Sequence, residues 1–167
     1  MTSIIIPIYN EENRLEDNAR KIFAFLGRDV KKYEVIIVDD GSTDSTPLML
    51  LSLQKEYPIK IVTHKNNKGK GAAIKTGINE AGGNLIFFTD IDLSVPIHFI
   101  NRFLDSVTEK DDIIIGTRVA AGSKIEKKQF FLRELLGGGF TLFSNLLLRV
   151  GVSDFTCGFK LFKKKAA

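Results

Sequence analysis

The sequence predicts an α/β fold, in which a mostly parallel sheet carries helices on both faces. Short, uniformly apolar runs alternate with segments whose apolar residues recur at helical spacing. Polar clusters follow directly after the predicted strands, which is where such sheets bind ligands. The composition, 44% hydrophobic and 26% charged over 167 residues, supports one packed domain. It excludes a disordered chain, a collagen-like fibre and a disulfide-stapled miniprotein.

Five strands are predicted, each bounded by polar or turn-forming residues. The first contains three consecutive isoleucines, which suits a strand buried on both faces. The second and fourth end at Asp39 and Asp90, Pro58 opens the third, and the fifth stops before Thr117. In chain order, the predicted strands are residues 3–8, 33–38, 59–64, 84–89 and 112–116.

Helices are predicted between the strands. Apolar residues recur at helical spacing from Leu15 to Leu26, with Asn10 as the expected cap and Gly27 as the expected end. The second helix has Pro47 in its first turn and Ser42, Asp44 or Ser45 as its cap. The later predicted helices are residues 71–81, 96–107 and 130–152. Residues 119–128 are expected to form an exposed loop, and no final element is evident.

Asp90-Ile91-Asp92, at the end of the fourth predicted strand, is the motif that points most clearly to a chemical function. Residues i and i+2 of extended backbone point to the same side, so the two carboxylates can hold one hard divalent cation, Mg²⁺ or Mn²⁺. That cation would bridge phosphate oxygens and stabilise a departing phosphate. The alternative is a capping loop before Ser94 and Pro96, and the position after a strand favours the metal.

Other clusters point to a phosphorylated ligand. Asp39-Asp40-Gly41-Ser42 offers carboxylates that can accept hydrogen bonds from a base or ribose, although capping by Ser42 is compatible with this. Residues 67–71 place two lysines and two glycines before a helix, which suits a phosphate as well as a flexible basic loop. Arg118 and Arg133 are candidate phosphate clamps, or ordinary surface arginines.

Other features of the sequence do not point to a nucleic-acid partner, a secretory signal or a further catalytic residue. The net charge of +4 is too small to indicate nucleic acid, and the N-terminus does not resemble a signal peptide. Cys157 is expected to be packed and reduced, and His64 and His98 to be structural. The apolar stretch over residues 130–152 has an uncharged core of 14 residues, too short for the ~20 that span a bilayer. It predicts either a core helix or an interfacial helix at an anionic membrane.

Taken together, the motifs resemble those of family 2 glycosyltransferases, which have the GT-A fold. The motifs that carry this resemblance, in order, are residues 6–12, 38–44, 67–72 and 90–94. The later motifs most resemble polyprenyl-phosphate sugar synthases, and dolichyl-phosphate β-glucosyltransferases in particular; they are residues 116–118, Arg133 and residues 154–162. Family members continue well past this last motif, so the C-terminal part of the family's fold is expected to be missing here.

The resemblance implies roles for individual residues. Asp92, Arg118 and Arg133 would be catalytic, with Asp92 on the metal and the arginines facing an acceptor phosphate. Asp90 would contact the sugar or ribose and share the metal. The residues expected to bind the nucleotide sugar are Pro7, Tyr9, Glu11, Asp39, Asp40, Lys70 and Asp90. Residues 1–118 would form the donor half and residues 119–167 an acceptor-side segment of the same domain.

The implied reaction moves a hexose, glucose from UDP-glucose, to a dolichyl or other polyprenyl phosphate, with inversion and with Mg²⁺ or Mn²⁺. Such an enzyme would act in the cytoplasm, at the cytoplasmic face of a membrane. The alternatives are GDP-mannose as donor, or a nucleotide-binding remnant without turnover. A sugar-phosphate nucleotidyltransferase would need a glycine-rich basic loop after the first strand, and a phospho-acceptor signalling domain would need its acidic pair there. The sequence has Tyr9-Asn10-Glu11-Glu12 instead.

Overall fold

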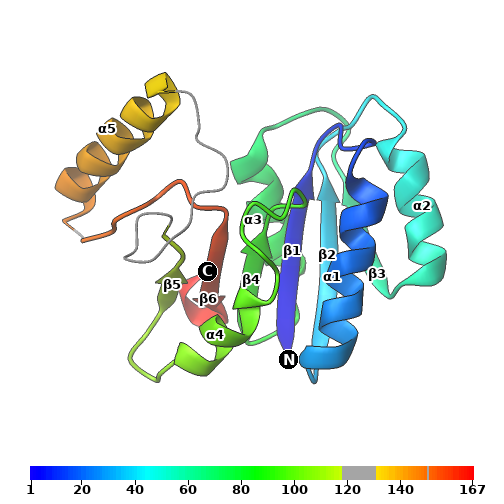
Figure 1. The fold of residues 1–167 in the computed structure, drawn as a ribbon, viewed down its shortest axis with the longest axis horizontal. Coiled ribbons are helices and arrows are strands. Elements are labelled where there is room, and N and C mark those ends of the chain that lie inside the picture. Colours follow the sequence, from blue (N-terminus) through cyan, green and yellow to red (C-terminus); the bar gives the residue numbers. More distant parts are fainter. Residues whose placement is uncertain (118–130, 150) are drawn as a thin grey trace.

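The computed structural model describes residues 1–117, 131–149 and 151–167. Six strands form one sheet in the order β3-β2-β1-β4-β6-β5 (Figure 1). The first four strands along the chain are parallel, and β6 is antiparallel to both of its neighbours. The strands are β1 (Thr2–Ile8), β2 (Tyr33–Asp39), β3 (Ile59–Thr63), β4 (Leu85–Thr89), β5 (Ile113–Ile115) and β6 (Phe159–Lys163).

Helices cover both faces of this sheet, as predicted. They are α1 (Leu15–Asp29), α2 (Thr46–Glu56), α3 (Lys70–Glu80), α4 (Phe99–Ser106), α5 (Phe131–Leu148) and the short 3₁₀ helix η1 (Lys164–Ala166). Alternate residues of β1 divide the core: Ile4 and Ile6 pack with α1, α2 and α4, whereas Ile5 packs with α3. All seven residues of β1 are buried, which confirms its prediction as a two-sided strand.

Two details of the first helix differ from prediction. Helix α1 runs through Gly27 to Asp29, because its buried apolar face continues as far as Val30. Asn10 does not cap α1, since Arg14 occupies the position before the helix and makes no side-chain cap. Instead, Asn10 takes a left-handed conformation with φ of 54° and contacts the next loop. Its role is to join two loops.

Strand β6 is the element that the sequence pattern missed. It lies between β4 and β5 and pairs with both, so a segment from the end of the chain completes the sheet. The lysines around it bind carbonyl groups: Lys163 Nζ donates to Thr108 and Glu109, and Lys164 Nζ donates to Ala81 at 2.9 Å. Lys165 pairs with Asp112 at 2.9 Å. The basic C-terminal cluster therefore holds the ends of two helices.

Helix α5 is polar toward the protein and apolar toward solvent over its described side chains. Ser144 is buried, and the Asn145 amide bonds both backbone groups of Val152, at 2.7 and 2.9 Å. The exposed side chains are Phe140, Leu142, Phe143, Leu146 and Leu147. Figure 1 shows α5 standing beside the β5 edge of the sheet, away from α1 and α2. No helix among the described residues has the length and hydropathy to cross a membrane.

Candidate functional site

The loops that follow β1 and β2 are bound to each other by reciprocal hydrogen bonds. The Asn10 backbone N–H donates to Ser42 Oγ at 2.9 Å, and Asn10 Oδ1 accepts from the Thr43 backbone N–H at 2.8 Å. The Glu11 N–H donates to Thr46 Oγ1 at 2.8 Å, and Glu12 accepts from the Ser45 N–H at 3.0 Å. The polar residues predicted after two different strands thus form one rigid edge of the sheet.

Asp39 and Asp40 are neighbours with opposite surroundings. Asp39 is fully buried; its Oδ1 accepts from the Ser42 N–H at 3.0 Å, while its Oδ2 has no hydrogen-bond partner within the described residues. Asp40 accepts from the backbone N–H groups of Lys68 and Gly69 at 3.0 and 2.7 Å, and contacts His64 Nδ1 at 2.6 Å. Asp40 therefore holds the loop before α3, and Asp39 retains a free acceptor.

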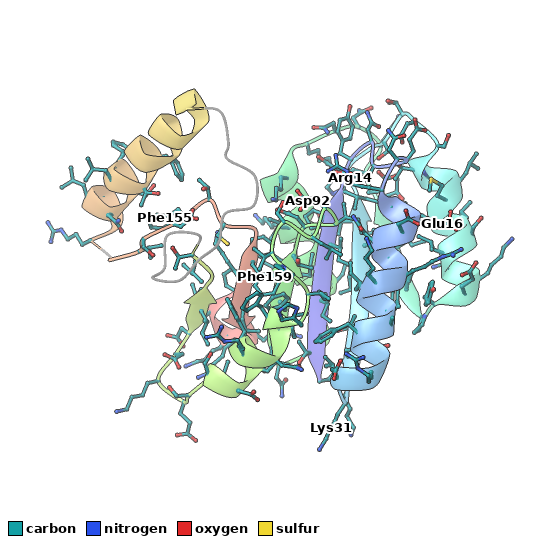
Figure 2. All side chains as sticks on the ribbon, viewed as in Figure 1. Arg14, Glu16, Lys31, Asp92, Phe155 and Phe159 are labelled. Carbon is teal, nitrogen blue, oxygen red and sulfur yellow. The ribbon has the colours of Figure 1, made fainter. Side chains whose placement is uncertain are left out.

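The loop after β4 presents Asp90 and Asp92 on either side of Ile91, which is buried and anchors the turn. Asn18 of α1 donates its amide to the Ile91 carbonyl at 3.0 Å and fixes the loop from the other side. Asp92 accepts from the backbone N–H and Oγ of Ser94, at 2.9 and 2.8 Å. Figure 2 shows Asp92 near Arg14, at the end of the sheet opposite Lys31.

Negative charge is concentrated at this edge. Burial raises the pKa of Glu11, the Arg14 guanidinium opposes this rise, and the charges of Asp92, Asp90 and Asp44 add to it. Arg14 Nε lies 2.6 Å from Glu11 Oε2 as an ion pair. Lys70, the first residue of α3, pairs with Asp90 at 2.6 Å. The negative charge of this edge is therefore partly neutralised by Arg14 and Lys70.

The donor set fits a hard divalent cation that also binds a phosphate. Among the described residues, no group of three or more His, Cys, Asp or Glu side chains is arranged to hold a metal by itself. Mg²⁺ and similar cations are usually bound by one or two carboxylates together with substrate phosphate oxygens. Asp90 and Asp92 supply two such carboxylates directly after β4, although residues 91–92 form a turn and not the extended backbone that was predicted. This chemistry matches Mg²⁺ or Mn²⁺ bound together with a diphosphate.

The segment before β6 folds back onto Asp90. A Cβ atom at Gly158 would lie 2.0 Å from Asp90 Oδ2, so a larger residue there would require this carboxylate to shift. Lys160 donates to the Phe155 carbonyl at 2.8 Å and lies over the Phe88 ring. Burial lowers the pKa of Lys160, and Asp90 is among the charges that act on it. The 154–160 segment therefore forms a wall of the candidate site.

The structure brings most of the predicted residues to one edge of the sheet. Pro7 is buried near the end of β1, and Tyr9 is exposed just beyond it. Arg118 and the side chain of Arg133 lie outside the described part of the structure. The residues at the site that the sequence did not single out are Asn18, Gly158 and Lys160. An isolated glycine beside a strand signals close backbone approach, which could have indicated Gly158.

Comparison with known proteins finds relatives that are named as dolichyl-phosphate or dolichol-phosphate sugar transferases. The chain is 37% identical over 178 residues to a dolichyl-phosphate beta-glucosyltransferase of Dictyostelium discoideum, covering 99% of this chain and 54% of that protein. It is 31% identical over 179 residues to the human protein of the same name, covering 99% and 55%. It is 30% identical to a dolichol-phosphate mannosyltransferase of Pyrococcus furiosus, covering 98% and 46%. The chain spans about half the length of these relatives.

Solved structures support the fold. A mannosyltransferase of Pyrobaculum calidifontis, in complex with GDP-Man and Mn²⁺, superposes with a TM-score of 0.69 at 20% identity, covering 98% of this chain and 44% of that one. Glucosyl-3-phosphoglycerate synthase of Mycobacterium tuberculosis, in complex with UDP, gives 0.70 at 19% identity, covering 99% and 57%. These likenesses confirm the predicted GT-A fold.

The family model described as glycosyl transferase family 2 matches residues 3–167, nearly the whole chain. The sequence motifs, the sheet and the acidic edge agree with this match, and the chain therefore belongs to glycosyl transferase family 2.

Proposed function

We propose that this chain forms the donor-binding part of an inverting transferase, which moves glucose from UDP-glucose to a dolichyl or other polyprenyl phosphate. The observation that carries the proposal is the buried, unpartnered Oδ2 of Asp39, at the same edge of the sheet as Asp90 and Asp92. A buried carboxylate oxygen without a partner is costly, so it indicates a ligand that donates a hydrogen bond. The relatives named as dolichyl-phosphate glucosyltransferases support the sugar and the acceptor.

The free oxygen of Asp39 suits a base that donates through a ring N–H. Asp39 Oδ1 accepts from the Ser42 N–H, and Oδ2 is the oxygen without a partner among the described residues. Uracil can donate to it through N3–H and guanine through N1–H, so the choice of UDP-glucose is supported by the relatives and not by this carboxylate. Pro7 and Tyr9 lie at the end of the neighbouring strand β1, where they can line the base.

In the proposed reaction, an acceptor phosphate oxygen attacks the anomeric carbon as the bond to the donor diphosphate breaks. The phosphate is already an anion, so no strong general base is required. Direct displacement converts an α-linked donor into a β-linked product. A divalent cation held by Asp90 and Asp92 would supply charge neutralisation for the diphosphate. Lys70 lies beside Asp90, where its ammonium can reach the same phosphates.

The acceptor is proposed to enter from the side formed by residues 119–167. The 154–160 segment of this part contacts Asp90 directly through Gly158. Arg118 and Arg133 would hold the acceptor phosphate, since arginine binds phosphate with two parallel hydrogen bonds. Residues 1–118 would then form the donor half of the domain.

The exposed face of α5 supports action at a membrane surface. Of its described side chains, Ser144 and Asn145 face the protein and five large apolar side chains face outward, the reverse of a helix adapted to water. We therefore propose the cytoplasmic surface of a bilayer as the occupant of this face.

The test compares thermal unfolding with UDP, GDP, UDP-glucose and GDP-mannose, each with and without Mn²⁺. A ligand at 100 times its dissociation constant adds about 2.7 kcal/mol, or roughly 5–10 °C for this size. Asp39→Asn keeps the acceptor for Ser42 and replaces the free acceptor with a donor. We expect this variant to fold normally and to lose the UDP shift, because its amide faces the imide N–H.

Asp105→Asn is the matched control, since Asp105 lines an open groove with Lys31 at the other end of the sheet. A UDP shift that survives in Asp39→Asn would contradict the assignment of the base. A larger shift with GDP would favour the mannose donor, which the Pyrococcus furiosus relative supports. The absence of any nucleotide shift would identify a remnant without a donor site.

A further inference from the structure

Lys70 contacts both carboxylate oxygens of Asp90. Its Nζ lies 2.6 Å from Oδ1 and 2.7 Å from Oδ2, so one ammonium occupies the position between the two oxygens. Gly158 closes a second side, because a Cβ atom there would overlap Oδ2. Asp90 is therefore held between a backbone segment and a lysine.

The Lys70 side chain is freer to move than the Asp90 carboxylate. The Lys70 side chain is 52% exposed, whereas that of Asp90 is 29% exposed. Lysine has a long, flexible stem and a compact charge, so it can change partners at low cost. Lys70 also begins α3, and helix N-termini favour anions, so a phosphate that approached Asp90 would meet this ammonium and the first turn of α3 together.

We propose that Lys70 is a displaceable counter-ion, which occupies Asp90 in the ligand-free protein and transfers to the diphosphate when donor and metal bind. The inference rests on the proposed function, since it assumes a metal shared by Asp90 and a diphosphate. A metal that binds alone must compete with the ammonium for Asp90 and lie beside a like charge. A diphosphate removes this obstacle by binding Lys70. Metal and nucleotide therefore assist each other, and the assistance is reciprocal.

The experiment measures Mn²⁺ binding, not turnover. Free Mn²⁺ is followed by its electron paramagnetic resonance signal as the protein is titrated, first without nucleotide and then with UDP. Lys70→Met retains the stem and removes the charge. We expect it to bind Mn²⁺ alone roughly fivefold more tightly, the size of a partly exposed ion pair. We also expect UDP to improve its Mn²⁺ affinity less than it does in the native chain.

Two variants control for other causes. Lys75→Met makes the same charge change on an exposed part of the same helix, and Lys70→Arg keeps a cation at the site. Lys75→Met is expected to bind Mn²⁺ alone as the native chain does, and Lys70→Arg, whose guanidinium still pairs with Asp90, is expected not to show the gain of Lys70→Met. Circular dichroism confirms that each variant is folded. Equal or weaker Mn²⁺ binding by Lys70→Met, or an equal gain in Lys75→Met, would overturn the proposal.

The failure of the proposed function gives a different pattern. In that case UDP alters Mn²⁺ binding in none of the proteins, including the native chain. The affinities of the native chain and Lys70→Met for Mn²⁺ without nucleotide still decide whether Lys70 competes with a metal for Asp90. Asp90→Asn supplies the reference, because it removes the carboxylate for which metal and lysine compete. It should weaken Mn²⁺ binding both in the native chain and in Lys70→Met.

Discussion

At the scale of single residues, Gly158 is the glycine that lies directly against the candidate site. A methyl group there would meet the Asp90 carboxylate at 2.0 Å, so the carboxylate must shift from the position in which it pairs with Lys70. We expect Gly158→Ala to weaken binding of the Mn²⁺–UDP pair by about tenfold and to cost roughly 1–2 kcal/mol of stability. Calorimetric titration and urea unfolding measure the two effects. Gly151→Ala is the control, because nothing lies within 4 Å of its Cβ position.

Asp40 gives a prediction about acid stability. Burial would raise its pKa, but the hydrogen bonds from His64, Lys68 and Gly69 outweigh burial and lower it below the ordinary 3.8. Its stabilising effect is therefore complete above the ordinary pKa and is lost as the pH falls toward the folded value. Asp40→Asn, whose NH₂ would face backbone donors, should lose about 2–4 kcal/mol at neutral pH.

The same variant should also lose less stability than the native chain when acidified from about pH 5 to pH 2, because it lacks the linked proton. Urea unfolding across this range provides the measurement, and Asp105→Asn again serves as the control. Parallel pH profiles for the native chain and Asp40→Asn would show that this carboxylate is not responsible for the acid loss.

Asp39 and Asp40 were both predicted to bind the nucleotide sugar from the family resemblance, and the sequence did not indicate that their surroundings differ. The turn at Gly41, with φ of 75°, places the carbonyl carbon of Asn66 2.7 Å from the Cβ position of Gly41, so the 64–69 loop approaches Asp40 from one side. That approach depends on a loop more than 20 residues away. No local pattern separates the two residues.

At the scale of elements, the loop after β1 depends on Asn10 for two separate reasons. Its φ of 54° disfavours most side chains, and its Oδ1 bonds the Thr43 N–H. Asn10→Gly keeps the backbone and loses the bond, and we expect a cost of about 1 kcal/mol. Asn10→Ala loses both, with an expected cost of about 2 kcal/mol. Equal costs in urea unfolding would show that the backbone conformation is unimportant.

Elements with local signals were predicted correctly, and β6 was missed because its signal is not local. The four parallel strands are apolar runs followed by polar turns, which a reader of the sequence can recognise. Strand β6, with the sequence Phe-Lys-Leu-Phe-Lys, is short and interrupted by lysines. It is stabilised by pairing with β4, whose residues lie 70 or more positions earlier. The contact of Gly158 with Asp90 follows from the same pairing.

At the scale of the whole molecule, the C-terminal segment links the sheet, the acidic edge and α5. Strand β6 lies within the sheet, Gly158 abuts Asp90, and the Phe155 ring contacts Phe140 of α5 with centroids 6.4 Å apart. Figure 2 shows Phe155 beside α5 and Phe159 within the core. A bilayer that binds α5 would therefore hold the candidate site close to the membrane surface, where the phosphate of a polyprenyl lipid lies.

This arrangement predicts that the apolar face of α5 controls vesicle binding. The double variant Leu142→Glu with Leu146→Glu removes two leucines that are 73% and 79% exposed. A buried leucine contributes about 1.5–3 kcal/mol, so loss of two should reduce binding at least tenfold. Flotation with vesicles of neutral and anionic phospholipids gives the measurement. The folded state should be unaffected, because neither side chain is packed in the protein.

Helix α2 offers a matched control for this prediction. Its Leu48 and Leu51 are also exposed, and Leu48→Glu with Leu51→Glu makes the same change in charge and hydropathy on a different surface. If α5 is the membrane-binding element, only the α5 variant loses binding. Equal loss in both variants would attribute binding to net charge. Size-exclusion chromatography across a range of concentrations separates the remaining case, because a dimer formed through α5 would dissociate in the α5 variant without any vesicles present.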